Sequence, residues 1–337
     1  MGRLRWSHPD RPGHRRLRHG RGFRYLDADG RPLTGAQRQR AIDLVIPPAW
    51  EDVWICPWDN GHIQAVGTDA AGRRQYLYHQ DFRAEQERAK HEHVLRAAAC
   101  LPEVRVRTAG LLEQRGLTRD RVLACGVRLL DLGFFRVGGE SYARDNGTYG
   151  LATMLRDHAR CRGGEIGFTY EGKGGKEQCR ALVDPAAYAV VRALLRRRDD
   201  GPRLFAYWER GAWHEVRSAD LNETLRELAG LDITAKDFRT WHATVLAAVG
   251  LAVSAPAAEA PTARKRAVSR VVREVSGYLG NTPAVCRASY INPRLFELFE
   301  AGRTIAPDLE HLGEGGRFGL PATQGPVEEA VRRLLTS

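Results

Sequence analysis

Residues 279–293 read Leu-Gly-Asn-Thr-Pro-Ala-Val-Cys-Arg-Ala-Ser-Tyr-Ile-Asn-Pro. Gly280 is a typical helix stop after the helical pattern of residues 262–279. Asn292 followed by Pro293 is a typical helix start, because asparagine caps a helix and proline fits its first position. The stretch therefore predicts a joint between two helices, and Tyr290 lies in that joint.

Three basic residues upstream make Tyr290 a candidate nucleophile: Arg136, Lys173 and Arg239. A free tyrosine attacks poorly because its pKa is about 10. Clustered cations stabilise phenolate character and the charge that develops on an attacked phosphate. Arginine offers paired donors to phosphate oxygens, and lysine can release a proton to a departing alkoxide. Together the residues predict transfer of a phosphodiester onto tyrosine, although each alone is more often a packed or solvated side chain.

Four segments, in this order, resemble motifs of the type IB DNA topoisomerases. They are Arg136-Val-Gly-Gly-Glu-Ser-Tyr142 with Gly147-Thr-Tyr-Gly-Leu151, then Phe168-Thr-Tyr-Glu-Gly-Lys173, then Lys236-Asp-Phe-Arg-Thr240, and lastly Gly280-Asn-Thr-Pro283 through Ser289-Tyr290. The resemblance is closest to the compact bacterial and poxvirus-type enzymes and runs from about Leu33 to Arg303. It implies that Tyr290 is the nucleophile, that Lys173 is the general acid, and that the phosphate ligands are Arg136, Arg239 and Asn281.

Asn281 departs from the pattern, because many relatives carry histidine at this position. An asparagine can still donate a hydrogen bond to a phosphate oxygen, but it cannot carry a positive charge. The bacterial branch accepts asparagine here, so the resemblance implies that activity is retained.

Five further residues are candidates for DNA binding. The alternating segment Gln75, Tyr76, Leu77, Tyr78 is similar to a DNA-facing strand of the compact enzymes, although two tyrosines on one face can also pack a core. Tyr142 matches a phosphate-contacting tyrosine of the relatives, and a packing role is the alternative. Lys176 is a second candidate acid, but the family pattern places the acid directly after the hairpin glycine, which selects Lys173. Lys176 is then a phosphate contact or solvated.

The composition agrees with a polyanionic partner. The 337 residues carry 52 Lys and Arg against 41 Asp and Glu, a formal charge of +11. The six cysteines form no CxxC pair, which favours reduced thiols in the cytoplasm over a disulfide framework or a zinc site. His91 and His93 are two residues apart, so they do not share a helix face and predict no metal pair. No apolar run is expected to reach the roughly 20 residues that span a bilayer, and no secretory signal is expected at the N-terminus.

The pattern along the chain predicts an α+β protein. Residues 1–22 are rich in Arg, His and Gly and are expected to form a flexible basic arm. Residues 23–82 alternate as strands around one helix and predict a small β-rich clamp domain. Residues 83–313 predict a larger, mainly helical catalytic domain, interrupted near residues 163–182 by a short hairpin. Residues 314–337 are left as a C-terminal tail or helix.

These observations predict an enzyme that relaxes supercoiled duplex DNA. Tyr290 would form a 3′-phosphotyrosyl link, the free strand would rotate, and the reverse reaction would reseal it without ATP, metal or small-molecule cofactor. The expected protein is a monomer that clamps DNA, is not bound to a membrane, and is associated with a bacterial nucleoid in the cytoplasm. A tyrosine recombinase or integrase is the first alternative, but it usually carries histidine where this chain has Lys236. A non-catalytic basic DNA-binding protein is the second, and it leaves the ordered motifs unexplained.

Overall fold

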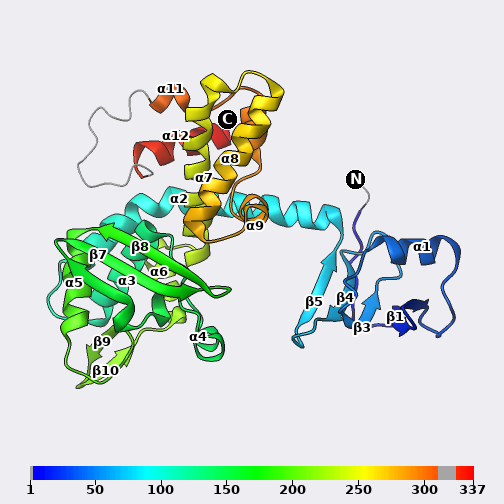
Figure 1. The fold of residues 1–337 in the computed structure, drawn as a ribbon, viewed down its shortest axis with the longest axis horizontal. Coiled ribbons are helices and arrows are strands. Elements are labelled where there is room, and N and C mark those ends of the chain that lie inside the picture. The colour runs from blue at the N-terminus through cyan, green and yellow to red at the C-terminus, as the bar shows by residue number, and fades with distance from the viewer. Residues whose placement is uncertain (1–2, 310–323) are drawn as a thin grey trace. The chain divides into compact units, whose positions relative to one another are not determined.

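The computed structural model describes residues 3–309 and 324–337 (Figure 1). The chain divides into two compact units, Met1–His91 and Glu92–Ser337. Helix α2 (Gln80–Leu112) begins in the first unit and ends in the second. The sequence placed this boundary near residue 82, inside what proves to be the first turn of that helix.

The first unit is built on a five-stranded antiparallel sheet in the order β2-β1-β3-β4-β5. Its strands are β1 (His14–His19), β2 (Gly22–Leu26), β3 (Glu51–Ile55), β4 (Ile63–Thr68) and β5 (Arg74–Tyr78). Helix α1 (Gly35–Asp43) contributes Ala41 to a small core with Val53, Ile55 and Ala65. The predicted β-rich domain is confirmed.

The expectation of a flexible arm over residues 1–22 is wrong for the part that the structure describes. Strand β1 lies between β2 and β3, and Arg16 points into the unit. Its guanidinium donates to the carbonyls of Ile46, Pro47 and Trp50 at 2.7, 2.9 and 2.8 Å, and it lies over the ring of Phe23. An arginine whose guanidinium is paired with carbonyls in this way can occupy a buried position in a strand. The basic composition therefore concealed a strand.

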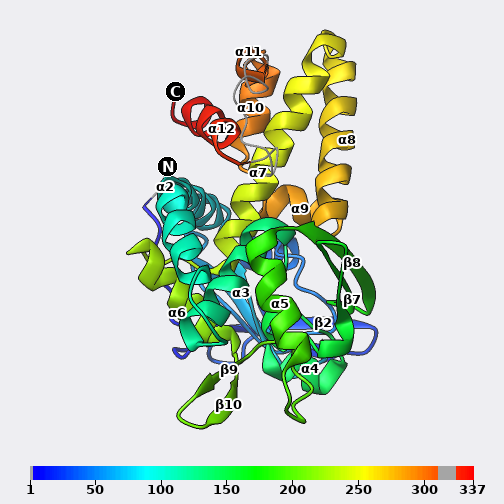
Figure 2. The same ribbon diagram turned by 90° about the vertical axis from the view of Figure 1, so that its left-hand side faces the viewer.

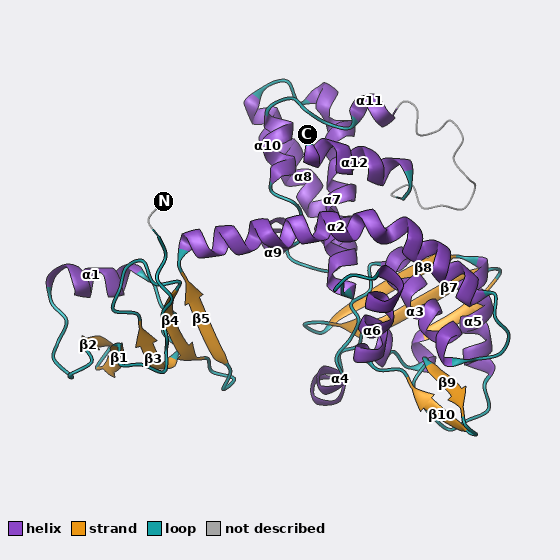
Figure 3. Ribbon diagram, turned by 180° about the vertical axis from the view of Figure 1, so that it is seen from behind, coloured by secondary structure: helices purple, strands orange, loops and turns teal. Residues whose placement is uncertain are grey.

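The second unit combines helices with a three-stranded antiparallel sheet (Figure 3). The sheet has the order β6-β7-β8, with β6 (Ala159–Arg162), β7 (Glu165–Gly172) and β8 (Lys176–Val183), so the predicted hairpin has gained a third strand. Helices α3 (Arg119–Gly133) and α5 (Pro185–Arg196) pack beside it. Helix α6 (Ser218–Ala229) and a hairpin of β9 (Ala206–Glu209) with β10 (Ala212–Glu215) complete this part.

Two long helices lie side by side in the rest of the second unit (Figure 2). They are α7 (Ala235–Ser254) and α8 (Pro261–Leu279), followed by α9 (Pro283–Ser289), α10 (Arg294–Glu300), α11 (Ala306–Leu309) and α12 (Pro326–Thr336). The predicted start of α7 is confirmed, because the Thr234 amide donates to the Asp237 carboxylate at 2.8 Å. Gly280 ends α8 in the left-handed conformation, with φ of 63°.

Helix α12 belongs to the core of the second unit and is not a separate tail. Glu328 is buried and pairs with Arg105 of α2, which also pairs with Asp131 at the end of α3. The indole nitrogen of Trp241 in α7 donates to the Glu328 carboxylate at 2.8 Å. One residue from each of four helices therefore meets in this cluster. Residues 310–323, in which the predicted boundary at 314 falls, lie outside the described residues.

Residues 235–257 are an exception to the prediction that no apolar run reaches membrane-spanning length. By length and composition alone, this helical stretch is long and apolar enough to cross a membrane, with a mean hydropathy of 1.3. However, 61% of its apolar window is buried inside the protein. Trp241, Val245 and Ala248 of this stretch belong to the main hydrophobic core. Its apolar character is that of a core helix.

Candidate active site

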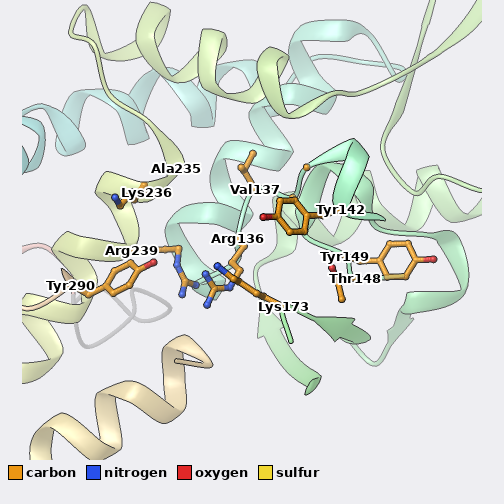
Figure 4. A pocket seen from close by; sticks show the side chains of 12 residues that line it. Arg136, Val137, Tyr142, Thr148, Tyr149, Lys173, Ala235, Lys236, Arg239 and Tyr290 are labelled. Carbon is orange, nitrogen blue, oxygen red and sulfur yellow. The ribbon is translucent and has the colours of Figure 1, made fainter. Parts of the chain in front are cut away.

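The four sequence motifs meet at one pocket of the second unit. The pocket has a volume of about 400 Å³, and its lining includes Arg136, Tyr142, Lys173, Lys236, Arg239 and Tyr290 (Figure 4). Short α4 (Glu140–Asn146) carries Tyr142, the turn between β7 and β8 carries Lys173, and α7 carries Lys236 and Arg239. Side chains more than 150 residues apart in the chain thus share one cavity.

Tyr290 lies at the end of α9, in the predicted joint between two helices. Its backbone is held by Thr244, a buried residue of α7 whose hydroxyl lies 3.3 Å from the Tyr290 carbonyl oxygen and 3.1 Å from the amide nitrogen of Asn292. Its ring lies beside the Arg239 guanidinium, at 5.5 Å from ring centre to Cζ (Figure 4). Burial raises the pKa of Tyr290, but Arg239 and Arg136 outweigh that effect, so the pKa is lowered. The phenol therefore sits where its anion is stabilised.

Arg239 is 4% exposed and is fixed at two points. One terminal nitrogen donates to the Phe134 carbonyl, and the other donates to the Leu279 carbonyl at 2.8 Å. Phe134 adopts the left-handed conformation, with φ of 56°, which a phenylalanine rarely takes. Burial, and then the charge of Arg136, lower the pKa of Arg239 to about 10. The Nε of Arg239 is buried with no hydrogen-bond partner among the described residues.

Arg136 is anchored through its backbone and paired through its side chain. The amide of Leu151 donates to the Arg136 carbonyl at 2.9 Å. Gly138 and Gly150 pack so closely beside it that a Cβ on Gly150 would lie 2.5 Å from Gly138 Cα, which explains the glycines of this motif. The Arg136 guanidinium donates to the side-chain oxygen of Asn281. Asn281 is thereby in the site, and its amide nitrogen is a second buried donor with no partner among the described residues.

Lys173 and Lys176 have different surroundings. Lys173 lies in the exposed turn between the two strands, where Gly174 and Gly175 have φ of 80° and 69°, and its side chain lies beside Arg136 (Figure 4). Lys176 is the first residue of β8 and is exposed, and it is not among the residues that line the pocket. The structure therefore brings Lys173, and not Lys176, together with the arginines.

In the first unit, Tyr76 and Tyr78 are 41% and 38% exposed, and their rings stack with centres 6.0 Å apart. Leu77, between them, packs against the core from the other face of β5. Gln75 shares that other face, and its amide donates to Asp69 at 2.9 Å. The tyrosines thus face solvent and do not form a core, and DNA binding by all three residues stays a prediction.

The comparison with known proteins decides the family. Residues 79–297 match the model of the catalytic core of eukaryotic DNA topoisomerase I, and residues 22–69 match that of the N-terminal domain of bacterial DNA topoisomerase IB. The chain belongs to the type IB DNA topoisomerases. It is 28% identical over 286 residues to DNA topoisomerase 1B of Acanthamoeba polyphaga mimivirus, covering 82% of this chain and 84% of the relative. It is 20% identical over 235 residues to DNA topoisomerase 1B of Vaccinia virus, strain Copenhagen, covering 69% and 71%.

Membership in the type IB topoisomerases confirms the predicted fold class and enzyme class, and it sets aside the recombinase and the non-catalytic alternatives. DNA topoisomerase activity and a duplex DNA substrate follow from the same match. The predicted order of motifs was therefore a sound guide to the family.

Sequence reasoning missed several residues that build the type IB site. Lys236, quoted only as part of a motif, lines the pocket. Thr244 holds the backbone at Tyr290, and Phe134 holds Arg239. Arg180 donates to the Tyr278 carbonyl at 2.8 Å. Of these residues, only Thr244 could have been found from the sequence, because a polar residue within the apolar run of α7 is expected to have a hydrogen-bond partner.

Residues 278–281, at the end of α8, receive three arginines, one from a strand, one from a helix and one from the loop between α3 and α4. Arg180 of β8 binds the carbonyl of Tyr278, Arg239 of α7 binds that of Leu279, and Arg136 binds the side chain of Asn281. The last carbonyls of a helix lack partners within the helix and carry its negative dipole end, so cations suit this place. The C-terminal turn of α8 is thus the common contact of the three arginines in the site.

Proposed function

We propose that Tyr290 is the nucleophile of DNA relaxation. Its oxygen attacks a backbone phosphate, a phosphorus–oxygen bond to tyrosine forms, and the bond to the 5′-oxygen breaks. The phenolic proton passes to solvent, and Lys173 gives a proton to the departing 5′-oxygen. The 3′-phosphotyrosyl link holds one end of the broken strand while its free 5′-hydroxyl end rotates, and the reverse steps reseal the DNA.

Arg136, Arg239 and Asn281 hold the nonbridging phosphate oxygens in this proposal. The support is that Arg239 Nε and the Asn281 amide nitrogen are buried donors without partners among the described residues. An unsatisfied buried donor is costly, and a phosphate oxygen would satisfy each of them. Both atoms are covered in the free protein, so DNA binding must expose them before they can stabilise the charge of a pentacovalent phosphate.

The single observation that carries the proposal is the placement of the Tyr290 phenol beside two guanidinium groups in an open pocket, where their charges favour a lowered pKa. The same groups supply what a metal would supply to a phosphate, namely positive charge and fixed geometry. We therefore propose that the reaction requires neither ATP nor a metal ion, since the phosphotyrosyl bond replaces the phosphodiester bond that it breaks.

We also propose that one copy of the chain acts on duplex DNA in the cytoplasm, without a membrane. In support, one unit of one chain supplies the whole pocket, and all six cysteines are free thiols.

The proposed DNA contacts are Tyr76, Tyr78, Tyr142, Lys176 and Gln75. The tyrosines are exposed, so Tyr76→Ala and Tyr78→Ala are expected to weaken DNA binding while leaving the melting temperature near that of the parent.

The test is relaxation of supercoiled plasmid by the purified protein with EDTA and without ATP. The parent should relax the plasmid and leave a protein–DNA adduct that survives denaturant. Tyr290→Phe should do neither, although its DNA affinity remains, because the phenol oxygen is a small part of the interface. Tyr278→Phe removes the hydroxyl of an exposed neighbouring tyrosine and should behave like the parent. An adduct formed by Tyr290→Phe would show that another residue attacks.

A further inference from the structure

The turn that carries Lys173 is weakly anchored at its tip. The Gly175 amide closes it by donating to the Gly172 carbonyl at 3.1 Å, and two glycines follow the lysine. No hydrogen bond or ion pair involving the Lys173 side chain is found among the described residues. A group that must meet the departing oxygen needs to be held within a fraction of an ångström. The anchor must therefore come from residues further along the two strands.

Gln178 supplies a contact between the Lys173 turn and the Asn281 turn. On β8 it pairs with Tyr170, and its side chain covers Gly172, so a Cβ there would lie 2.7 Å from Gln178 Cγ. The same side chain reaches the residue before Asn281, because a Cβ on Gly280 would lie 2.7 Å from Gln178 Oε1. One glutamine thus lies between the glycine that precedes Lys173 and the glycine that precedes Asn281.

Arg180 holds this glutamine and the end of α8 together. Its Nη2 donates to Gln178 Oε1 at 3.1 Å and to the Tyr278 carbonyl at 2.8 Å, and its Nη1 donates to the Cys179 carbonyl at 2.9 Å. Arg180 and Gln178 both line a small cleft that also includes Arg136, Lys173 and Arg239. The half-buried guanidinium at the negative end of a helix dipole is favourably placed.

We propose that Arg180, acting with Gln178, is a positioning residue that sets the Lys173 turn against the end of α8. It orients the proton donor for the departing 5′-oxygen and does not itself contact the phosphate. This inference rests on the proposed role of Lys173 as the general acid. It adds a physical link between the acid on the sheet and the phosphate ligands on the helices.

The experiment measures single-turnover cleavage on two matched DNA substrates, one with oxygen and one with sulfur at the scissile 5′-bridging position. A thiolate leaves without protonation, so the sulfur substrate bypasses the acid. Arg180→Ala and Gln178→Ala should slow cleavage of the oxygen substrate by up to about 10²-fold, the scale of a misplaced group. Both should recover most of that loss on the sulfur substrate. Arg162→Ala removes an exposed arginine of the same sheet and should match the parent on both substrates.

Three outcomes distinguish a failure of the positioning role of Arg180 from a failure of the proposed acid role of Lys173. If Lys173→Ala is rescued by sulfur and Arg180→Ala is not, the positioning role is wrong, and Arg180 serves the phosphate ligands instead. If Lys173→Ala is itself not rescued, the premise about the acid is wrong. If the melting temperature of Arg180→Ala lies far below that of Arg162→Ala, the slower cleavage could come from partial unfolding. Arg180→Lys, which keeps the charge, is then the variant that tests the positioning role. The proposal then requires a cleavage defect in Arg180→Lys that sulfur removes, and its absence overturns the proposal.

Discussion

At the scale of single residues, the ionisation of Tyr290 is set by two opposing effects. Burial raises its pKa, and the nearby Arg239 and Arg136 lower it by more. On the sulfur substrate, where the acid is not needed, cleavage should rise with pH to a plateau whose midpoint lies below about 10, the ordinary pKa of tyrosine. Arg136→Ala removes one of the lowering charges, so its midpoint should move to higher pH.

The measurement is a pH series of single-turnover rates for the parent, Arg136→Ala and the control Arg162→Ala. Only the midpoint of Arg136→Ala should move to higher pH. A midpoint that does not move would mean that Arg136 acts on the phosphate alone and not on the phenol.

Asn281 offers a second prediction at this scale, because its two polar atoms have different surroundings. Its oxygen accepts from Arg136, and its nitrogen is buried without a partner among the described residues. Asn281→Ala should slow cleavage less than Arg136→Ala, since a neutral hydrogen bond is weaker than a charge-assisted one. Asn281→Asp keeps the shape but replaces the donor with a negative acceptor, so it should be slower than Asn281→Ala. The reverse order would remove the amide nitrogen from the set of phosphate ligands.

At the scale of elements, two glycines at the end of α8 allow a test of how strongly the site depends on the turn at Gly280. Gly280 has a positive φ and no room for a Cβ beside Gln178, whereas Gly277 of the same helix has open space around it. Gly280→Ala should lower the free energy of unfolding by at least about 1 kcal/mol and slow cleavage. Gly277→Ala should leave cleavage unchanged and raise stability by roughly 0.5–1 kcal/mol, the helix preference of alanine over glycine.

Urea unfolding and the cleavage assay together check this pair. Equal stability of the two variants would show that neither the positive φ of Gly280 nor its closeness to Gln178 is costly for alanine, and the contact between the turns would lose its support.

The elements also show how far the sequence alone can lead. The helix ends at Thr234 and Gly280 were predictable because capping chemistry is local. The five catalytic candidates could be named because their motifs keep a fixed order, and their catalytic roles stay predictions. Strand β1 was not predictable, since its burial of Arg16 depends on three carbonyls from a distant segment. The contact of Arg180 with the Tyr278 carbonyl was not predictable either, because Tyr278 is 98 residues away and only the folded chain brings the two together.

At the scale of the whole chain, the last helix stabilises the helix that carries Arg239. Glu328 of α12 accepts from Trp241 of α7 and pairs with Arg105 of α2. Glu328→Ala should cost about 3 kcal/mol of unfolding free energy, the scale for breaking a buried ion pair. Glu329→Ala, at the neighbouring exposed position, should cost no more than about 0.5 kcal/mol, although it removes a surface pair with Arg332.

Denaturant unfolding of the two variants checks this prediction. A small loss in Glu328→Ala would mean that Asp131 alone satisfies Arg105, and that α12 contributes little to the unit.

The convergence of three arginines on residues 278–281 also bears on the safety of the genome that the enzyme handles. Each arginine belongs to a different stretch of chain, and each has an acceptor at the end of α8. If the proposed catalytic roles hold, we expect that a chain still being synthesised, or a separated fragment that ends between Arg136 and Tyr290, cannot nick DNA. In the proposed mechanism, cutting and resealing depend on the same assembled set of side chains, so we expect the two abilities to arise together on folding.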